Sequence, residues 1–316
     1  MVMPKDTHGV DRRRLLSRLG GEFQLDAARR VAHSLSRDVA TVLVFLEINR
    51  ANVAALAASR EPIAEPHAGV PGLPPDHMRE PVSIYLAARN LGMPYETARR
   101  HVKKLTQIDL CETVSGGVII PARAFLDPRL MAVAAENWAA TVEFVQAAGR
   151  LGVSASGLRQ PASPDQFRQV NRAVSAYCLE TACHMSRVMD LEPLAVLILR
   201  AVNLANVRHV TQDPDAALAH ASLADILPDA ERRPISVYGL AKYLLLPYET
   251  VRRSLLQLEA KGLVRRDERG LIVPAEVVAR PAVVAGIAEL VALTEILLSD
   301  LAAAGLAYQP DSESVF

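Results

Sequence analysis

Residues 81–121 read PVSIYLAARNLGMPYETARRHVKKLTQIDLCETVSGGVIIP, and residues 234–274 read PISVYGLAKYLLLPYETVRRSLLQLEAKGLVRRDERGLIVP. The two stretches align without a gap at an offset of 153, from the pair Pro81 and Pro234 to the pair Pro121 and Pro274. Both contain the run Pro-Tyr-Glu-Thr and, two residues later, the pair Arg-Arg. A repeat of this kind indicates one supersecondary element that the chain uses twice.

The similarity continues on both sides of these stretches. Upstream, residues 37–53 resemble residues 191–207, and both segments end in Asn-x-Ala-Asn-Val. Downstream, Pro128 matches Pro281, and each precedes an Ala-rich stretch with helical character. The sequence therefore predicts a duplicated module of about 150 residues, a usual domain size. We place the modules at residues 1–152 and 153–316, with the join in the Gly-, Ser- and Pro-rich residues 152–164.

The composition favours helices and an intracellular protein. Half of the residues (50%) are apolar and only 4% are aromatic, with Ala and Leu prominent. The longest apolar run, residues 281–298, contains Glu289 and Glu295 and has amphipathic spacing, so we expect a soluble helix and no membrane partner. The charged N-terminal residues do not resemble a secretory signal, and three cysteines are too few for a disulfide framework. These features predict a cytoplasmic location.

The charge is distributed unevenly although the net charge is zero. Residues 79–105 contain six Arg or Lys and two Glu, and residues 232–274 contain nine Arg or Lys and four acidic residues. A local basic patch is the electrostatic pattern expected of a DNA-binding face.

Each repeated stretch predicts a helix, a turn, a second helix and a hairpin. Ser83 and Ser236 suit the N-cap of the first helix, and a proline precedes the second helix in both copies. One face of the second helix is apolar, and Gly117 and Gly270 suit the hairpin turn. Gly92 in the first helix–helix turn is replaced by Leu245 in the second, so we expect the two turns to differ. The apolar positions are Ala98, Val102 and Leu105 in one copy and Val251, Leu255 and Leu258 in the other.

This order resembles the winged helix-turn-helix of bacterial transcription regulators of the MarR and GntR kinds. The resemblance depends on LAKYLLLPYETVRRSLLQLEAKGLVRRDERGLIVP at residues 240–274 and on the weaker copy at residues 87–121. It implies that the second helix of each copy enters the major groove of DNA, while the hairpin follows phosphates or the minor groove. The implied reading surfaces are Tyr95, Glu96, Thr97, Arg99, Arg100, Lys103 and Lys104 in the first copy, and Tyr248, Glu249, Thr250, Arg252, Arg253 and Gln257 in the second.

The side chains of these surfaces suit different parts of DNA. Arg can bond the guanine edge, and Glu can accept from cytosine. We expect phosphate contacts, which position without specifying, from Lys103, Lys104, Arg265, Arg266 and Arg269. The first hairpin, ETVSGG, has no basic residue, so the second copy should hold DNA more strongly. A basic helix face is often only solvated surface, but folding alone gives no evident reason to repeat an exposed Tyr, Glu and two Arg.

The predicted fold is therefore mainly α, with two tandem winged helix-turn-helix modules that mimic a dimer. Helices at residues 36–58, 128–149, 190–209 and 281–303 should bury the interface between the halves. If the halves are related by a pseudo-two-fold axis, the reading helices should lie about 34 Å apart, which is one turn of DNA.

The functional hypothesis is a bacterial, nucleoid-associated transcription regulator that binds specific double-stranded DNA, without enzymatic activity, catalytic residues or a cofactor. One alternative is a plasmid or phage replication initiator, although such proteins tend to be strongly basic. Another is a winged-helix scaffold that binds proteins and no DNA. RNA polymerase, another regulator or a further copy of the chain would be compatible partners. Whether the protein activates or represses, its operator and any effector stay open.

Other candidate residues give weaker signals. Cys178, Cys183 and His184 are close in sequence, but their spacing is unusual for zinc. His101 should be partly buried or contact a phosphate, and Tyr85 and Tyr238 should be half-buried packing residues. Residues 59–80 and 210–233 should form long loops, which could serve as a DNA-contacting arm, a partner-binding strip or a spacer.

Overall fold

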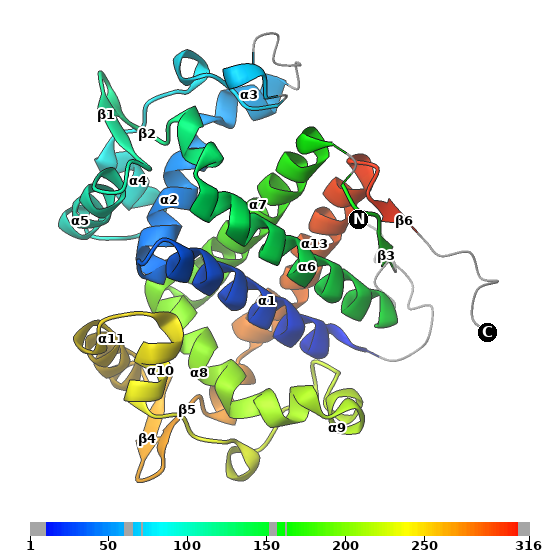
Figure 1. Ribbon diagram of the computed structural model, residues 1–316. Coiled ribbons are helices and arrows are strands. Elements are labelled where there is room, and N and C mark those ends of the chain that lie inside the picture. The colour runs from blue at the N-terminus through cyan, green and yellow to red at the C-terminus, as the bar shows by residue number, and fades with distance from the viewer. Residues whose placement is uncertain (1–10, 60–65, 71, 152–156, 162, 309–316) are drawn as a thin grey trace.

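The computed structural model describes residues 11–59, 66–70, 72–151, 157–161 and 163–308 (Figure 1). In this part of the chain the protein is mainly α-helical, as predicted, and its strands form short antiparallel pairs. The first half contains α1 (Arg13–Ser34), α2 (Val39–Asn52), α3 (Ala54–Ser59), α4 (Ile84–Asn90), α5 (Tyr95–Thr106), β1 (Glu112–Val114), β2 (Gly117–Ile119) and α6 (Pro128–Arg150). The second half contains α7 (Pro164–Met189), α8 (Pro193–Gln212), α9 (Pro214–Ala219), α10 (Val237–Leu244), α11 (Tyr248–Ala260), β4 (Arg265–Asp267), β5 (Gly270–Ile272), α12 (Ala275–Val278) and α13 (Pro281–Ala303). A further pair joins β3 (Gly157–Leu158) to β6 (Ala307–Tyr308).

Each repeated stretch folds as helix, turn, helix and hairpin, which confirms the predicted order. We call residues 81–121 the first unit, with α4, α5 and β1–β2, and residues 234–274 the second unit, with α10, α11 and β4–β5. Ser83 Oγ accepts from the Leu86 N–H at 3.1 Å, and Ser236 Oγ accepts from the Gly239 N–H at 3.0 Å, so both predicted N-caps are present. All six apolar positions predicted for the inner face of α5 and α11 are buried.

The helix–helix turns of the two units share a left-handed residue, so the difference expected from the change of Gly92 to Leu245 is not seen at that position. Gly92 has φ 55° and Leu245 has φ 53°, both in the left-handed region. A side chain usually avoids this region because its Cβ approaches the following carbonyl. Leu245 is partly buried against the main core, and this packing offsets the conformational cost.

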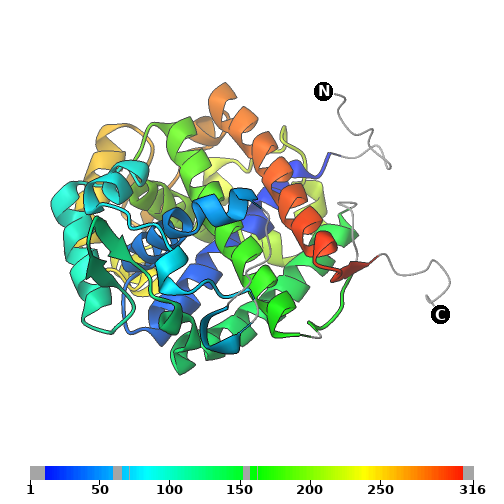
Figure 2. The ribbon, with the colours of Figure 1, turned by 90° about the horizontal axis from the view of Figure 1, so that it is seen from above.

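Helices α1 and α7 join the two halves of the molecule. Both contribute to the main cluster of buried apolar residues, which spans the two units, and both contribute to a second, aromatic cluster. In the second cluster the rings of Phe23 and Phe144 stack with centroids 4.7 Å apart. Between the two helices, Gln24 Nε2 donates to the Cys178 carbonyl at 2.6 Å. Helix α13 runs along α7 (Figures 1 and 2).

The four long helices expected at the interface are all present, as α2, α6, α8 and α13. They share the interface with α1 and α7, which the sequence analysis did not include. Because the main cluster continues from one half to the other, the halves share a core. The division at residues 1–152 and 153–316 stays a prediction, and part of its join, residues 152–156 and residue 162, lies outside the described residues.

Of the two segments predicted as long loops, the second, residues 210–233, contains more helix than expected. Helix α8 extends to Gln212, and α9 follows it, so the prediction of an irregular loop at 210–233 was wrong in that part. In the other segment, residues 60–65 and 71 lie outside the described part of the chain, and single turns cover His67–Gly69 and Asp76–Met78.

Within the described ranges, two helices are long and apolar enough to cross a membrane, judged by length and composition. Helix α8 is mostly buried in the main core. Helix α13 packs its apolar side on α7 and α1, and Glu289, Glu295 and Ser299 lie on its exposed side. This arrangement is that of amphipathic helices in a shared core.

Candidate nucleic-acid interface

Helices α5 and α11 lie on the same side of the molecule, with hairpin β1–β2 at one end of that side and hairpin β4–β5 at the other (Figure 1). The apolar face of each helix packs on the long helix that precedes its unit, α2 for α5 and α8 for α11. Burial of that face leaves the polar residues toward solvent. The two predicted reading surfaces are therefore accessible and share one side.

Four tyrosines are exposed at equivalent places in the two units. Tyr85 and Tyr238, in the first turns of α4 and α10, are 64% and 70% exposed, so the prediction of half-buried packing residues was wrong. Tyr95 and Tyr248, which begin α5 and α11, are 46% and 51% exposed. A large aromatic side chain that is half exposed or more gains only part of the free energy of full burial. The exposure of all four tyrosines is therefore a feature that the two units share.

Glutamate and arginine side chains form the same ion pair in both helices. Arg99 Nη2 lies 2.9 Å from Glu96 Oε2, and Arg252 Nη2 lies 2.6 Å from Glu249 Oε1. Glu249 also lies 3.5 Å from Arg253. These exposed pairs stabilise their helices slightly. They provide a folding reason for the repeated Glu and first Arg, which the sequence analysis did not find.

The remaining residues of the first reading surface differ in their surroundings. Lys104 Nζ lies 2.6 Å from Asp38 Oδ2, at the N-cap of α2, so this lysine holds α5 against α2. Arg100 donates only to the Thr97 hydroxyl at 3.3 Å among the described residues, and Lys103 is exposed. Arg100 and Lys103 are therefore the cations of this helix that are available to an anionic partner.

The basic residues of the second hairpin all have acidic partners. Arg265 pairs with Asp229 at 2.9 Å, Arg266 with Glu259 at 2.8 Å, and Arg269 with Asp267 at 3.5 Å. Just after the first unit, Arg123 pairs with Glu112 of β1. The charge of the second hairpin is thus partly compensated. The stronger hold of the second unit on DNA stays a prediction.

Helices α5 and α11 flank one hollow of about 520 Å³ that opens to solvent. Glu192 and Leu194, at the N-terminal end of α8, also line it. The separation of about 34 Å between the two reading helices stays a prediction, and the shared hollow argues for a closer spacing of α5 and α11. The polar lining consists of Thr97, Arg100, Glu192, Glu249, Thr250, Arg253, Ser254 and Gln257.

Two arginines counted in the basic patches are structural. Arg79 and Arg232 are 4% and 3% exposed, and each lies near an aspartate three residues earlier. The aspartates fix the backbone after each hairpin, because Asp76 accepts from the Ala122 N–H at 2.6 Å and Asp229 from the Ala275 N–H at 2.7 Å. The sequence signal was available, since Pro-Asp-x-x-Arg precedes both units.

His101 is buried and has a structural role. Its Nδ1 lies 2.8 Å from the Thr41 hydroxyl, which donates to Asp38 Oδ1. Burial lowers the pKa of His101 to about 4, although the nearby Asp38 opposes this change. At neutral pH the imidazole is therefore uncharged. The sequence predicts either burial or a phosphate contact for His101, and the structure shows burial.

The cysteines do not form a metal centre with their neighbours in the described residues, where no group of three or more His, Cys, Asp and Glu gathers. His184 Nε2 lies 3.0 Å from the Gly286 carbonyl and joins α7 to α13. Burial raises the pKa of Cys178 to about 12, so its thiol stays protonated.

Comparisons with protein-family models, with curated proteins and with solved structures give no significant match to this chain.

Proposed function

We propose that the chain is a double-stranded DNA-binding transcription regulator in which both units act as winged helix-turn-helix modules. Helices α5 and α11 are the reading helices, and hairpins β1–β2 and β4–β5 are the wings. The protein would act in the bacterial cytoplasm, without a cofactor or an enzymatic step. A protein-interaction scaffold and a replication initiator are the alternatives that experiments must separate from it.

The repeated exposed tyrosines support this proposal most strongly. Tyr85, Tyr95, Tyr238 and Tyr248 are exposed at matching positions of the two units. A tyrosine on a DNA-binding face offers a hydroxyl to phosphate oxygens and a ring to sugars and bases. Packing does not explain four such exposures, and contact with a polyanion does.

The cations beside the tyrosines support the same partner. Arg100 and Lys103 in α5 have no carboxylate within 4.0 Å among the described residues, and Arg253 is held only loosely, at 3.5 Å. Arginine can reach a guanine edge in two places, and lysine can neutralise phosphate. Because α5 and α11 flank one hollow, both should contact one continuous segment of duplex.

Fluorescence anisotropy with labelled genomic duplexes tests the proposal. The wild-type chain should bind duplex DNA more weakly as salt rises, since each phosphate contact releases a counterion. The double variant Tyr95→Ala, Tyr248→Ala should weaken binding by about tenfold or more. Met131→Ala, which removes an exposed apolar side chain of α6, is the matched control and should leave binding unchanged.

The result also separates the alternatives. A wild-type chain that binds no duplex at low salt would contradict the proposal and favour the protein scaffold. Genome-wide mapping then separates a regulator, bound at promoters, from an initiator, bound at a replication origin.

A further inference from the structure

A second, largely apolar cavity lies away from the hollow between α5 and α11. It is a partly open space of about 110 Å³ between α1, α7, α8 and α13. Met189, Leu199, Val207 and Ile287 are among its apolar walls. Apolar walls combined with a few polar groups are typical of a small-molecule site, and this volume suits only a small ligand.

Among the described residues, four arginines line the cavity, and Asp225 is the only carboxylate in its lining. Arg14 and Arg18 are both 7% exposed, and Arg232 is 3% exposed. Arg200 is held by neutral groups, since its Nη1 donates to Gln24 Oε1 at 2.7 Å. The lining therefore has a surplus of positive charge in surroundings that contain little water.

The guanidinium groups of Arg14 and Arg18 are buried without an ion pair. Arg14 donates to the carbonyls of Ser222 and Leu223, and Arg18 donates to the His220 carbonyl. Neither arginine has a carboxylate within 4.0 Å in the described part of the chain, and Arg18 Nε there has no hydrogen-bond partner. Burial of an unpaired charge costs several kcal/mol, and an anion in the cavity would offset that cost.

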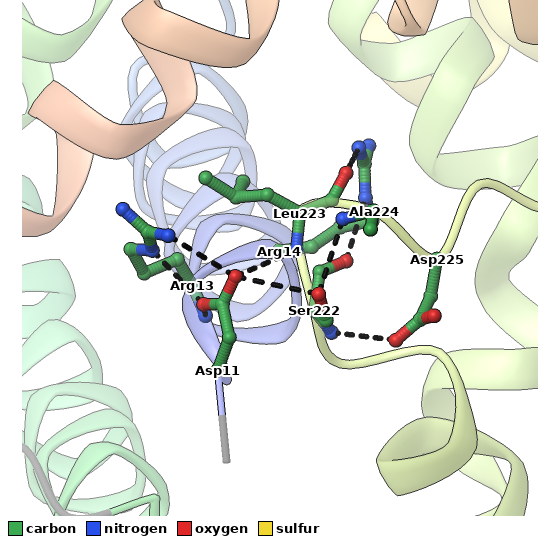
Figure 3. A network of polar contacts seen from close by, with 7 residues as sticks. All are labelled: Asp11, Arg13, Arg14, Ser222, Leu223, Ala224 and Asp225. Carbon is green, nitrogen blue, oxygen red and sulfur yellow. Dashed lines mark hydrogen bonds and ion pairs between the residues drawn. The ribbon is translucent and has the colours of Figure 1, made fainter. Parts of the chain in front are cut away.

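Residues 222–225, beside these arginines, are held by a network of polar contacts that includes Asp11 (Figure 3). Asp11 Oδ2 accepts from the Leu223 N–H at 3.1 Å, and Asp225 Oδ2 accepts from the Ser222 N–H at 3.1 Å. Asp11 and Asp225 are therefore engaged with the backbone of this segment. Burial and the nearby charge of Arg14 lower the pKa of Arg18 to about 10, so Arg18 remains charged at neutral pH.

We propose that this cavity binds a small apolar carboxylate, with the carboxylate at Arg18 and Arg14 and the apolar body among the aliphatic side chains of α7, α8 and α13. The site does not depend on the proposed DNA binding. Helix α8 nevertheless lines both places, with Leu194 at the hollow and Leu199 at the cavity.

Isothermal titration calorimetry and thermal denaturation with straight-chain saturated monocarboxylates, hexanoate to dodecanoate, test this site. At neutral pH at least one carboxylate should bind and raise Tm as its concentration rises. The primary alcohol of the same length should have an affinity at least about tenfold lower, since it lacks the charge-assisted hydrogen bonds.

Variants locate the site. Arg18→Gln should weaken carboxylate binding by about tenfold while leaving alcohol binding nearly unchanged. Arg30→Gln, a partly buried arginine of α1 outside the cavity lining, is the matched control and should bind as the wild type does. The proposal is overturned if no carboxylate binds the wild-type protein, if alcohols bind equally well, or if a folded Arg18→Gln variant keeps full carboxylate affinity.

Discussion

Asn52 in α2 and Asn206 in α8 make the same three hydrogen bonds in the two halves of the protein. Asn52 Nδ2 donates to the carbonyls of Glu80 at 2.7 Å and Val118 at 3.1 Å, and its Oδ1 accepts from the Ile120 N–H at 2.8 Å. In the same way, Asn206 Nδ2 donates to the carbonyls of Arg233 at 2.8 Å and Leu271 at 3.0 Å, and its Oδ1 accepts from the Val273 N–H at 2.9 Å. Each asparagine thus fastens a hairpin and the start of its unit to a core helix.

We predict that Asn52→Ala and Asn206→Ala each destabilise the protein by about 2–4 kcal/mol, because buried backbone groups lose their partners. Chemical denaturation followed by circular dichroism measures the change. Gln107→Ala, at an exposed position just after α5, is the control. A loss of stability no greater than that of the control would mean that water replaces the hydrogen bonds of the asparagine at no cost in free energy.

The left-handed turn gives a second prediction. Gly92 has φ 55°, and an added Cβ would meet nothing closer than 3.6 Å, so the cost of a side chain there is conformational. Gly92→Ala should lower the free energy of unfolding by about 1 kcal/mol. Gly92→Asn should lose less, since asparagine tolerates this conformation. Equal stability of the alanine variant and the wild type would contradict the assigned turn geometry.

Acid should destabilise the first unit through His101. Its pKa is about 4 in the folded protein and 6.5 without perturbation, so the unfolded chain binds more protons between these values. Stability should therefore fall as pH decreases from about 6.5 toward 4, by on the order of 3 kcal/mol in total. Burial raises the pKa of Asp38, but its hydrogen bonds with Lys104 and Thr41 and the nearby charges outweigh burial and lower that pKa, so protonation of Asp38 adds to the loss below pH 4.

Denaturation at a series of pH values measures this effect, and His101→Gln should remove the part of the slope between pH 6.5 and 4. If the variant and the wild type lose stability in parallel over that range, another group is responsible.

The ion pairs of the reading helices predict an effect on DNA affinity. Glu249→Gln releases Arg252 and Arg253 from their acidic partner and removes a negative charge from the proposed interface. Binding to duplex DNA should tighten and depend more steeply on salt. Glu136→Gln, an exposed substitution on α6 with the same change in net charge, is the control. Weaker binding by Glu249→Gln with all sequences would contradict the expected electrostatics, whereas weaker binding with one sequence would identify Glu249 as a base contact.

The repeat made much of this fold predictable. Identical spacing of apolar residues, capping serines and hairpin glycines determined the order of elements in both units, because local chemistry determines these features. The apolar faces of α2, α6, α8 and α13 were likewise readable from the sequence. Helix α1 was missed because Arg14, Arg18, Arg29 and Arg30 interrupt its pattern, and only the fold reveals that it crosses into the other half.

The candidate site was less predictable. Exposure of Tyr85 and Tyr238 depends on how α4 and α10 pack, which their short sequences do not specify. The pairing of Lys104 with Asp38 joins residues that are far apart in sequence. The cavity arginines come from α1, α8 and the segment before α10, so no local pattern could bring them together.

The central claim is that both units hold the same piece of DNA. The most direct test is anisotropy with one labelled duplex over a range of salt concentrations, for wild type, Arg100→Ala, Arg253→Ala and the double variant, with the exposed Arg280→Ala as control. Each single variant should weaken binding and should reduce the slope of log affinity against log salt concentration by about one. The double variant should reduce that slope by about two, since one phosphate contact is lost in each unit. An unchanged affinity and slope in either single variant would show that its unit does not touch the duplex, and would contradict the claim.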